Sequence, residues 1–272
     1  MRLKADVGPL EGQTALVTGA SSGIGAQIAI AMGAAGAKVG VNYSRNDKGA
    51  EQVVQEITLS SGQAVALQAD VSREDEVRAM FDAFFDNFGT IDILVSNAGI
   101  QKDSAFVDMS MEQWNAVLGI NLTGAFLCAR EAVKAFLRRG AAPAGSRALG
   151  KILFISSVHE VIPWAGHANY ATAKGGLMML MKTLAQELAP QKIRINSIAP
   201  GAIKTRINEA VWSDPEGAAA MLKLIPYGRI GEATDIAPVA VWLASDEADY
   251  ITGTTIFVEG GMLLYPGFRT GG

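Results

Sequence analysis

Cysteine and histidine are scarce in this sequence, which has one cysteine and two histidines in 272 residues. A lone cysteine, Cys128, cannot form an internal disulfide, and the chain offers no ligand cluster for zinc. These absences favour a reducing compartment, and we predict no metal site. We expect Cys128 to be a small buried residue in a helix.

Long apolar runs and concentrated basic charge are also lacking. We find no apolar run that approaches the roughly 18 residues of a membrane span, and Met1–Asp6 lacks the apolar core of a signal peptide. The formal net charge is −4. Nucleic-acid and anionic-membrane surfaces need clustered Lys and Arg. We therefore expect a cytoplasmic protein that binds a small molecule and partners neither nucleic acid nor membrane.

Glycine, in contrast, is abundant, with 30 residues against 9 prolines, and 49% of the chain is hydrophobic. This composition suits a buried sheet with many tight strand–helix turns. Short apolar runs alternate with helical patterns, and no low-complexity linker divides them. The pattern predicts one α/β domain over residues 1–272, a doubly wound parallel sheet of about seven strands with helices on both faces.

A glycine turn joins the first predicted strand, 14–18, to a helix that begins near Ile24. Glycine stands where the chain bends sharply and where backbone must approach a ligand closely. The N–H groups that open the helix point at the same spot and can hold a diphosphate. A tight turn without a ligand is the alternative, but the flanking strand and helix favour a dinucleotide site of the Rossmann type. The predicted contacts are Gly19, Ser21, Ser22, Gly23, Ile24 and Gly25.

The second predicted strand, 38–42, ends where a dinucleotide fold selects between NAD and NADP. An acidic residue there would bind the ribose hydroxyls and repel a 2′-phosphate. This chain has Asn42, Tyr43, Ser44 and Arg45 instead, and Ser44 with Arg45 can receive the phosphate. NADP is favoured and NAD stays open; a solvated loop cation is the alternative for Arg45. Later strand ends are expected beside the cofactor, at Asp70 and Val71 near the adenine and at Asn97, Ala98 and Gly99.

Tyr170 and Lys174 form a candidate proton-transfer pair. If their stretch is helical, the phenol and the ammonium stand on one face, one turn apart. An ammonium about 4 Å away contributes about 4 kcal/mol at an effective dielectric of about 20, enough to bring the pKa of the phenol near neutrality. Ser157 ends the strand 151–157 at the same edge of the sheet. In the helix near Met111, the amide of Asn121 stands within an apolar stripe, as a structural bridge or a water anchor.

Together these motifs resemble the short-chain dehydrogenase/reductase family. The matching elements are Thr18-Gly19-x-x-x-Gly23-x-Gly25, Asn97-Ala98-Gly99, Asn121, Ser157, Tyr170-x-x-x-Lys174 and Pro200-Gly201-x-x-x-Thr205. One departure is Ser96, where many members have a second Asn. The resemblance implies a cytoplasmic, homotetrameric NAD(P)-dependent oxidoreductase whose nicotinamide meets the segment with Pro200, Gly201, Ile203 and Thr205.

The family's roles carry over to four residues of this chain. By the resemblance, Ser157 would hydrogen-bond the substrate oxygen and Tyr170 would exchange its proton. Lys174 would stabilise the phenolate and hold the ribose, and Asn121 would anchor a proton-relay water. The cofactor would carry the hydride.

Within the family the chain is similar to bacterial glucose 1-dehydrogenases, through Ser156–Trp164, Pro200–Asn208 and Gly260–Phe268. The similarity implies oxidation of the anomeric hydroxyl of an aldose such as β-D-glucose to its 1,5-lactone. The implied substrate contacts are Gln101, Ser157, His159, Tyr170, Ile207 and Asn208. Gln101 stands where those enzymes carry Glu and Arg206 where they carry Pro, and His159 has a structural role as its alternative.

Other functions remain open at this point. A 3-oxoacyl-carrier-protein reductase is one, weakly favoured by a basic helix face from Arg130 to Arg139 that could dock an acidic carrier protein. A broad carbonyl reductase and a non-catalytic NAD(P)-binding regulator are the others. We also expect residues 201–231 to form a mobile lid over the substrate and the apolar tail 262–272 to pack on another subunit.

Overall fold

Seven parallel strands form one sheet in a computed structural model that describes residues 8–143 and 145–264. Their order is β3-β2-β1-β4-β5-β6-β7, and every neighbouring pair is parallel. This confirms the predicted doubly wound sheet. The bounds are β1 (Thr14–Val17), β2 (Lys38–Tyr43), β3 (Gln63–Gln68), β4 (Ile93–Ser96), β5 (Gly150–Ile155), β6 (Ile193–Pro200) and β7 (Thr255–Val258).

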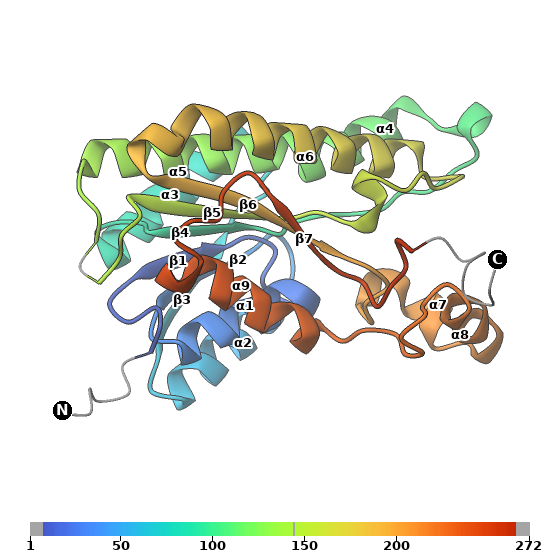
Figure 1. Cartoon of the computed structure of the whole chain (residues 1–272), viewed down its shortest axis with the longest axis horizontal. Coiled ribbons are helices and arrows are strands. Elements are labelled where there is room, and N and C mark those ends of the chain that lie inside the picture. Colours follow the sequence, from blue (N-terminus) through green and yellow to red (C-terminus); the bar gives the residue numbers. More distant parts are fainter. Residues whose placement is uncertain (1–7, 144, 265–272) are drawn as a thin grey trace.

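Helices cover both faces of the sheet (Figure 1). One face carries α3 (Glu74–Phe88), α4 (Met111–Leu118), α5 (Ala125–Arg139) and α6 (Ala168–Leu188), and the other carries α1 (Gly23–Ala34), α2 (Asp47–Leu59) and α9 (Ala233–Ala244). Two short helices, α7 (Glu209–Trp212) and α8 (Pro215–Leu222), lie to one side of these layers. Single turns of other helix types lie at Phe106–Asp108, Gly119–Gly124, Val158–Glu160, Ala189–Gln191, Arg206–Asn208 and Asp246–Ala248.

Strand β1, in the interior of the sheet, contributes to two hydrophobic cores. Ala15 and Val17 pack with the α1 side, and Leu16 packs with the α3 side, because successive side chains of a strand point to opposite faces. A strand covered on both faces is apolar throughout rather than alternating. This is why the first strand reads as a continuous apolar run in the sequence.

The order of the strands reverses beside β1. From β1 the chain builds outward through β2 and β3, and then returns to β4 on the other side of β1. A crevice opens beyond the carboxyl ends of the strands at such a switch point, and open parallel sheets bind their ligands there. The turns after β1 and β4 therefore meet at the predicted cofactor site.

One helical stretch, Met111–Arg139, is long and apolar enough to cross a membrane when judged by length and composition alone. The expectation that no apolar run approaches that length was therefore wrong among the described residues. The apolarity has a packing origin, because α5 buries Leu127, Cys128 and Phe136 in the core on the α3 side. In the most apolar window, 44% of the residues are buried inside the fold.

The segment predicted to form a lid is tied at both of its ends. Ile203 pairs with Gly231 in an isolated bridge, the N–H of Lys204 donates to the carbonyl of Gly231 at 2.9 Å, and the N–H of Gly231 donates to the carbonyl of Ala202 at 2.9 Å. The chain between these ties holds α7 and α8. Because its two ends meet at one point, we expect this part to move as a unit, and the lid itself stays a prediction.

Candidate active site

The turn between β1 and α1 presents unused backbone donors. The N–H groups from Ser21 to Gly25 find no acceptor among the described residues, and the side chain of Ser22, at the N-cap of α1, makes no capping hydrogen bond. Free N–H groups at the start of a 12-residue helix favour an anion. The turn therefore fits the diphosphate of a dinucleotide.

The glycines of this turn are required by close contacts. Gly19 has φ +61°, and a Cβ there would lie 2.8 Å from the Cα of Ala98; a Cβ on Gly25 would lie 2.4 Å from Nδ2 of Asn97. Nδ2 of Asn97 donates to the carbonyls of Thr18 (2.9 Å) and Gly19 (3.1 Å). The predicted contacts Asn97 and Ala98 thus act first on the protein itself, by holding the glycine turn against the end of β4.

The cofactor-selecting position divides into a structural and an exposed part. Asn42 is 1% exposed; its Oδ1 accepts from the N–H of Gly19 at 3.1 Å, and its Nδ2 donates to the carbonyls of Leu67 in β3 (3.1 Å) and of Ala69 just after it (3.2 Å). Asn42 therefore joins the ends of three strands and has no atom left for a ribose. Ser44 and Arg45 are exposed beside it, where they can meet a 2′-phosphate.

Asp70 and Val71 follow β3 as predicted, but both side chains make contacts within the protein. Oδ1 of Asp70 accepts from the N–H (2.9 Å) and the hydroxyl (2.7 Å) of Ser72. Val71 is 5% exposed and contacts Gly124, where a Cβ would lie 2.7 Å from its Cγ2. Contact with adenine would therefore use the backbone of this turn or Oδ2 of Asp70, because Oδ1 is bonded to Ser72.

Helix α6 carries Tyr170 and Lys174 on one face, as the sequence predicts. Nζ of Lys174 lies 5.5 Å from the centroid of the Tyr170 ring and donates to the carbonyl of Ile155, at the end of β5, at 2.8 Å. Ser157 follows β5 and is 7% exposed. Its hydroxyl and the side chain of Gln101 lie near the Tyr170 hydroxyl, and both act to lower its pKa. The structure thus brings Gln101, Ser157, Tyr170 and Lys174 together.

Burial governs the pKa of both members of the pair. It raises the pKa of the Tyr170 phenol, against the opposing effects of Ser157 and Gln101. It lowers the pKa of Lys174 to about 8, against the opposing charge of Glu160. The expectation that Lys174 brings the phenol's pKa near neutrality was therefore wrong for these residues alone, because desolvation of the phenolate is the largest influence.

The amide of Asn121 bridges two segments of backbone. It is 1% exposed and lies in a π-helical turn between α4 and α5. Its Oδ1 accepts from the N–H of Ile100 at 2.8 Å, and its Nδ2 donates to the carbonyl of Ile100 at 3.0 Å. Of the two roles that the sequence left open, the side chain fulfils the structural bridge. It fixes the loop after β4 that carries Gly99 and Gln101.

Two histidines and a tryptophan are stacked beside Tyr170. The rings of His159 and Trp164 have centroids 4.3 Å apart, and those of Trp164 and His167 have centroids 3.4 Å apart. Nδ1 of His159 lies 3.1 Å from the carbonyl of Ile162, an acceptor, so Nδ1 carries the proton and Nε2 is an acceptor. Burial lowers the pKa of His159, which favours this neutral form. His159 can therefore accept a hydrogen bond from a substrate hydroxyl.

Asn208 serves its own loop instead of facing a substrate. Its Oδ1 accepts from the N–H and the hydroxyl of Thr205, both at 3.0 Å, and its Nδ2 donates to the carbonyl of Ile203 at 2.9 Å. The geometry therefore does not support its expected contact with a sugar. Pro200 ends β6 and Ile203 is 5% exposed. The side chain of Ile207 lies outside what the structure describes.

Some residues of the site gave no signal in the sequence. Asn169 is fully buried, and its Nδ2 donates to the carbonyls of Lys102 (2.9 Å) and Gln113 (3.3 Å), so it pins the start of α6 beside Tyr170. A polar residue directly before the tyrosine was the only hint. Within residues 8–143 and 145–264 there is no group of three or more His, Cys, Asp or Glu residues arranged for a metal ion.

Comparison with known proteins identifies the family. The model of a protein family described as enoyl-(acyl carrier protein) reductase matches residues 19–263. A solved short-chain type dehydrogenase/reductase from Mycobacterium marinum superposes with a TM-score of 0.87 at 35% identity, over 96% of this chain and 99% of that one. The chain belongs to the short-chain dehydrogenase/reductase family and is an NAD(P)-dependent oxidoreductase.

Relatives with different substrates are similar to the chain over almost its whole length. It is 48% identical to 3beta-hydroxysteroid dehydrogenase 1 of Eggerthella lenta, over 96% of this chain and 98% of the relative. It is 41% identical to glucose 1-dehydrogenase 2 of Bacillus subtilis (94% and 97%) and to 3-oxoacyl-[acyl-carrier-protein] reductase of Synechocystis (94% and 99%). The resemblance to glucose dehydrogenases is thus real but is not the strongest of these three.

A solved relative holds a cofactor. Gluconate 5-dehydrogenase from Burkholderia cenocepacia, in complex with NADP and tartrate, has a TM-score of 0.85 and 34% identity, over 93% of this chain and 96% of that one. The glycine turn and the cluster around Tyr170 fit such a dinucleotide in this chain. When bound, its nicotinamide accepts or donates the hydride.

Proposed function

We propose that this oxidoreductase interconverts a secondary alcohol and a carbonyl at the cluster of Ser157, Tyr170 and Lys174. Ser157 donates to the substrate oxygen, Tyr170 takes or gives the hydroxyl proton, and the Lys174 ammonium stabilises the phenolate. Asn121 holds the loop that borders them, and its role as anchor of a proton-relay water stays a prediction. The observation that carries the proposal is the Tyr170 hydroxyl beside Ser157, one helical turn from a buried ammonium that is anchored to the end of β5.

The favoured cofactor is NADP. The exposed Ser44 and Arg45 at the end of β2 support it, because no carboxylate stands there to repel a 2′-phosphate. NAD remains an accepted alternative. The nicotinamide would meet the segment that holds Pro200, Gly201, Ile203 and Thr205.

As substrate we propose an aldose such as β-D-glucose, oxidised at C1 to the 1,5-lactone. Support comes from Gln101 and His159, which give polar contacts close to Tyr170, and from the glucose dehydrogenase at 41% identity. A sugar needs several such donors and acceptors in one pocket. Asn208 is hydrogen-bonded to Thr205 and Ile203, so the proposed sugar pocket has one polar contact fewer than the sequence predicts.

A 3β-hydroxysteroid is the second candidate. It is supported by the hydroxysteroid dehydrogenase at 48% identity and by apolar side chains around the site. Trp164, within the stack of rings, is 39% exposed, and Val161, two residues after His159, is 53% exposed. A rigid ring system could cover such surface and gain hydrophobic stabilisation.

A 3-oxoacyl-carrier-protein reductase is less favoured by the charges on α5. The cations expected to attract an acidic carrier protein already have acidic partners, since Arg130 pairs with Glu74 (2.7 Å) and Lys134 with Glu131 (2.9 Å). Arg139 is bonded to the nearly buried Asp92. The basic face is therefore largely neutralised.

A substrate comparison tests these proposals. Purified protein is assayed for reduction of NADP with β-D-glucose and with a 3β-hydroxysteroid, and for oxidation of NADPH with an acetoacetyl thioester. Turnover of glucose alone supports an aldose as the substrate, whereas turnover of the steroid alone supports a 3β-hydroxysteroid instead. Cofactor binding without any turnover would support a non-catalytic regulator.

The assembly and cellular location are further proposals. We propose a homotetramer, in which the apolar tail packs on a neighbouring subunit; of this tail, 265–272 lie outside the described residues. Light scattering of the purified protein tests the mass. The cytoplasmic location, the exclusion of nucleic acid and membrane, and the single domain over 1–272 stay predictions.

A further inference from the structure

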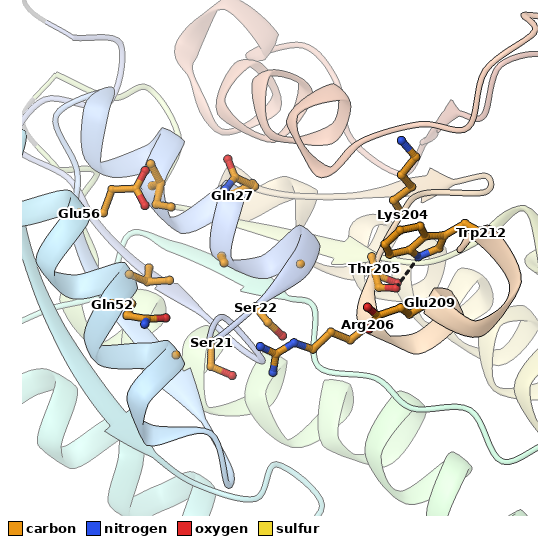
Figure 2. A pocket seen from close by; sticks show the side chains of 15 residues that line it. Ser21, Ser22, Gln27, Gln52, Glu56, Lys204, Thr205, Arg206, Glu209 and Trp212 are labelled. Carbon is orange, nitrogen blue, oxygen red and sulfur yellow. Dashed lines mark hydrogen bonds between the residues drawn. The ribbon is translucent and has the colours of Figure 1, made fainter. Parts of the chain in front are cut away.

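Arg206 is a cation aimed at the glycine turn from across a cavity. It lies between β6 and α7 and lines a cavity of about 450 Å³ together with Ser21, Ser22 and Gly23. Figure 2 shows its guanidinium extended from the far wall toward Ser21 and Ser22. Arg206 and the turn lie far apart in the sequence, so the fold alone brings them together.

The backbone that carries Arg206 is well fixed. Thr205 lies over the turn, since a Cβ on Gly23 would be 3.5 Å from its Cγ2. The N–H and the hydroxyl of Thr205 donate to Asn208, and its carbonyl accepts from Nε1 of Trp212 at 2.9 Å. The guanidinium therefore projects from a braced turn.

Within the described part of the chain Arg206 has no ion pair, although two carboxylates, Glu56 and Glu209, line the same cavity. Lys204, the other cation of this wall, is paired with Glu232 at 2.7 Å. Among the residues that the structure describes, no carboxylate lies within 4 Å of the Arg206 guanidinium. It faces the N-terminal end of α1, which is positively polarised and holds unused N–H groups. A cation and a helix N-terminus repel each other unless an anion lies between them.

We infer that Arg206 binds the diphosphate of the cofactor, opposite the glycine turn. The inference rests on the proposal that this turn seats the diphosphate. A planar guanidinium can hold two phosphate oxygens at once, which suits the linked phosphates of a dinucleotide. The 2′-phosphate would lie at Ser44 and Arg45, at the end of β2, so Arg206 serves NAD and NADP alike. Because Thr205 is hydrogen-bonded to Asn208 and Trp212, the same contact would link the start of the predicted lid to the bound cofactor.

Calorimetric titration tests the inference without turnover. NADP, NAD and ADP are titrated into the wild-type protein, Arg206→Ala and the control Lys204→Ala. Loss of a charge-assisted contact should raise the Kd of all three ligands by about tenfold in Arg206→Ala. Added salt should narrow this difference. Lys204→Ala should stay within about twofold of the wild type, since its charge is already paired.

Each other outcome overturns the inference. Unchanged Kd values in Arg206→Ala would show that Arg206 does not contact the cofactor. A raised Kd for NADP with an unchanged Kd for NAD would show that Arg206 contacts the 2′-phosphate instead of the diphosphate. A raised Kd for both dinucleotides with an unchanged Kd for ADP would show that Arg206 contacts the nicotinamide half of the cofactor. An equal loss of affinity in Lys204→Ala would indicate a general effect of positive charge.

The seat itself has a separate control, Ser22→Asp, which keeps a good N-cap for α1 but repels a phosphate. Wild-type affinity in Ser22→Asp would refute the proposal that the glycine turn holds the diphosphate. Weak binding by Ser22→Asp together with wild-type affinity in Arg206→Ala would refute only the role of Arg206.

Discussion

The Lys174 ammonium lies 5.5 Å from the centroid of the Tyr170 ring and is anchored to the carbonyl of Ile155 at 2.8 Å. This anchor joins α6 to the end of β5, where Ser157 follows. Burial raises the pKa of the phenol and lowers that of the ammonium to about 8. Desolvation thus sets the pKa of both groups, and the Lys174 ammonium is a positive charge on the same helix face that can favour the phenolate.

Lys174→Met should therefore shift the pH dependence of alcohol oxidation. Removing the charge makes the Tyr170 phenolate harder to form, so the acidic limb of the kcat/KM profile should move to higher pH. At neutral pH we expect a fall in rate of about tenfold or more. Rates measured across pH, with cofactor saturating, check this. An unmoved limb with a raised cofactor KM would mean that Lys174 only holds the cofactor.

Arg45→Ala should separate the two cofactors. The side chain is exposed at the end of β2, where a 2′-phosphate would lie. We expect the Kd of NADP to rise by about tenfold and that of NAD to change by less than about twofold. Titration of both into the variant measures this difference, and NAD serves as the internal control. Equal effects on the two cofactors would refute the phosphate assignment.

Lys151→Met should flatten the dependence of stability on pH. Lys151 is 1% exposed, its Nζ donates to Oε1 of Gln13 at 2.6 Å, and burial lowers its pKa to about 8. Below pH 8 the lysine is charged in both states, so the cost of burying the charge is fully present. Between pH 8 and its unfolded pKa of about 10.4 the unfolded state binds more protons, so stability rises with pH.

The size of this rise is at most about 3 kcal/mol for Lys151, and Lys174 contributes a similar one. Urea unfolding at a series of pH values measures it. In Lys151→Met the free energy of unfolding should rise less with pH than in the wild type. Lys48 is an exposed lysine at the start of α2, so Lys48→Met should keep the wild-type dependence on pH. A slope unchanged in Lys151→Met would show that this lysine is not the titrating group.

Cys128 should resist thiol reagents in the folded protein. It is fully buried in α5, and burial, with the charge of Glu131, raises its pKa to about 12. Thiolate is the reactive form, so labelling at pH 8 should be negligible until a denaturant is added, when one thiol per chain should react. Rapid labelling of the native protein would contradict the packing of α5.

Much of the fold follows from the sequence because its signals are local. Apolar strand runs and helical periodicity alternate, and a strand such as β1, buried on both faces, has no reason to alternate with polar residues. The cluster of Ser157, Tyr170 and Lys174 was also predictable, because strand ends and a single helix turn bring them to one edge.

Other features depend on contacts that spacing does not reveal. Asn208 was expected to meet a sugar, but a short turn places it against Thr205 and Ile203. The pKa of Tyr170 depends on how deeply the ring is buried, which no motif encodes. Arg206 attracted notice only as a departure from relatives, because its position opposite Ser22 arises from chain far away in the sequence.

Turnover and cofactor binding by Tyr170→Phe test the central claim most directly. The ring and its packing against His159 and Trp164 stay, and only the hydroxyl group with its exchangeable proton is lost. With the substrate that the wild-type protein uses best, kcat should fall by about 10² to 10⁴, while the Kd of NADP stays within about twofold. A variant that binds NADP normally and keeps turnover close to that of the wild type would contradict the assignment of Tyr170 as the proton-transfer group.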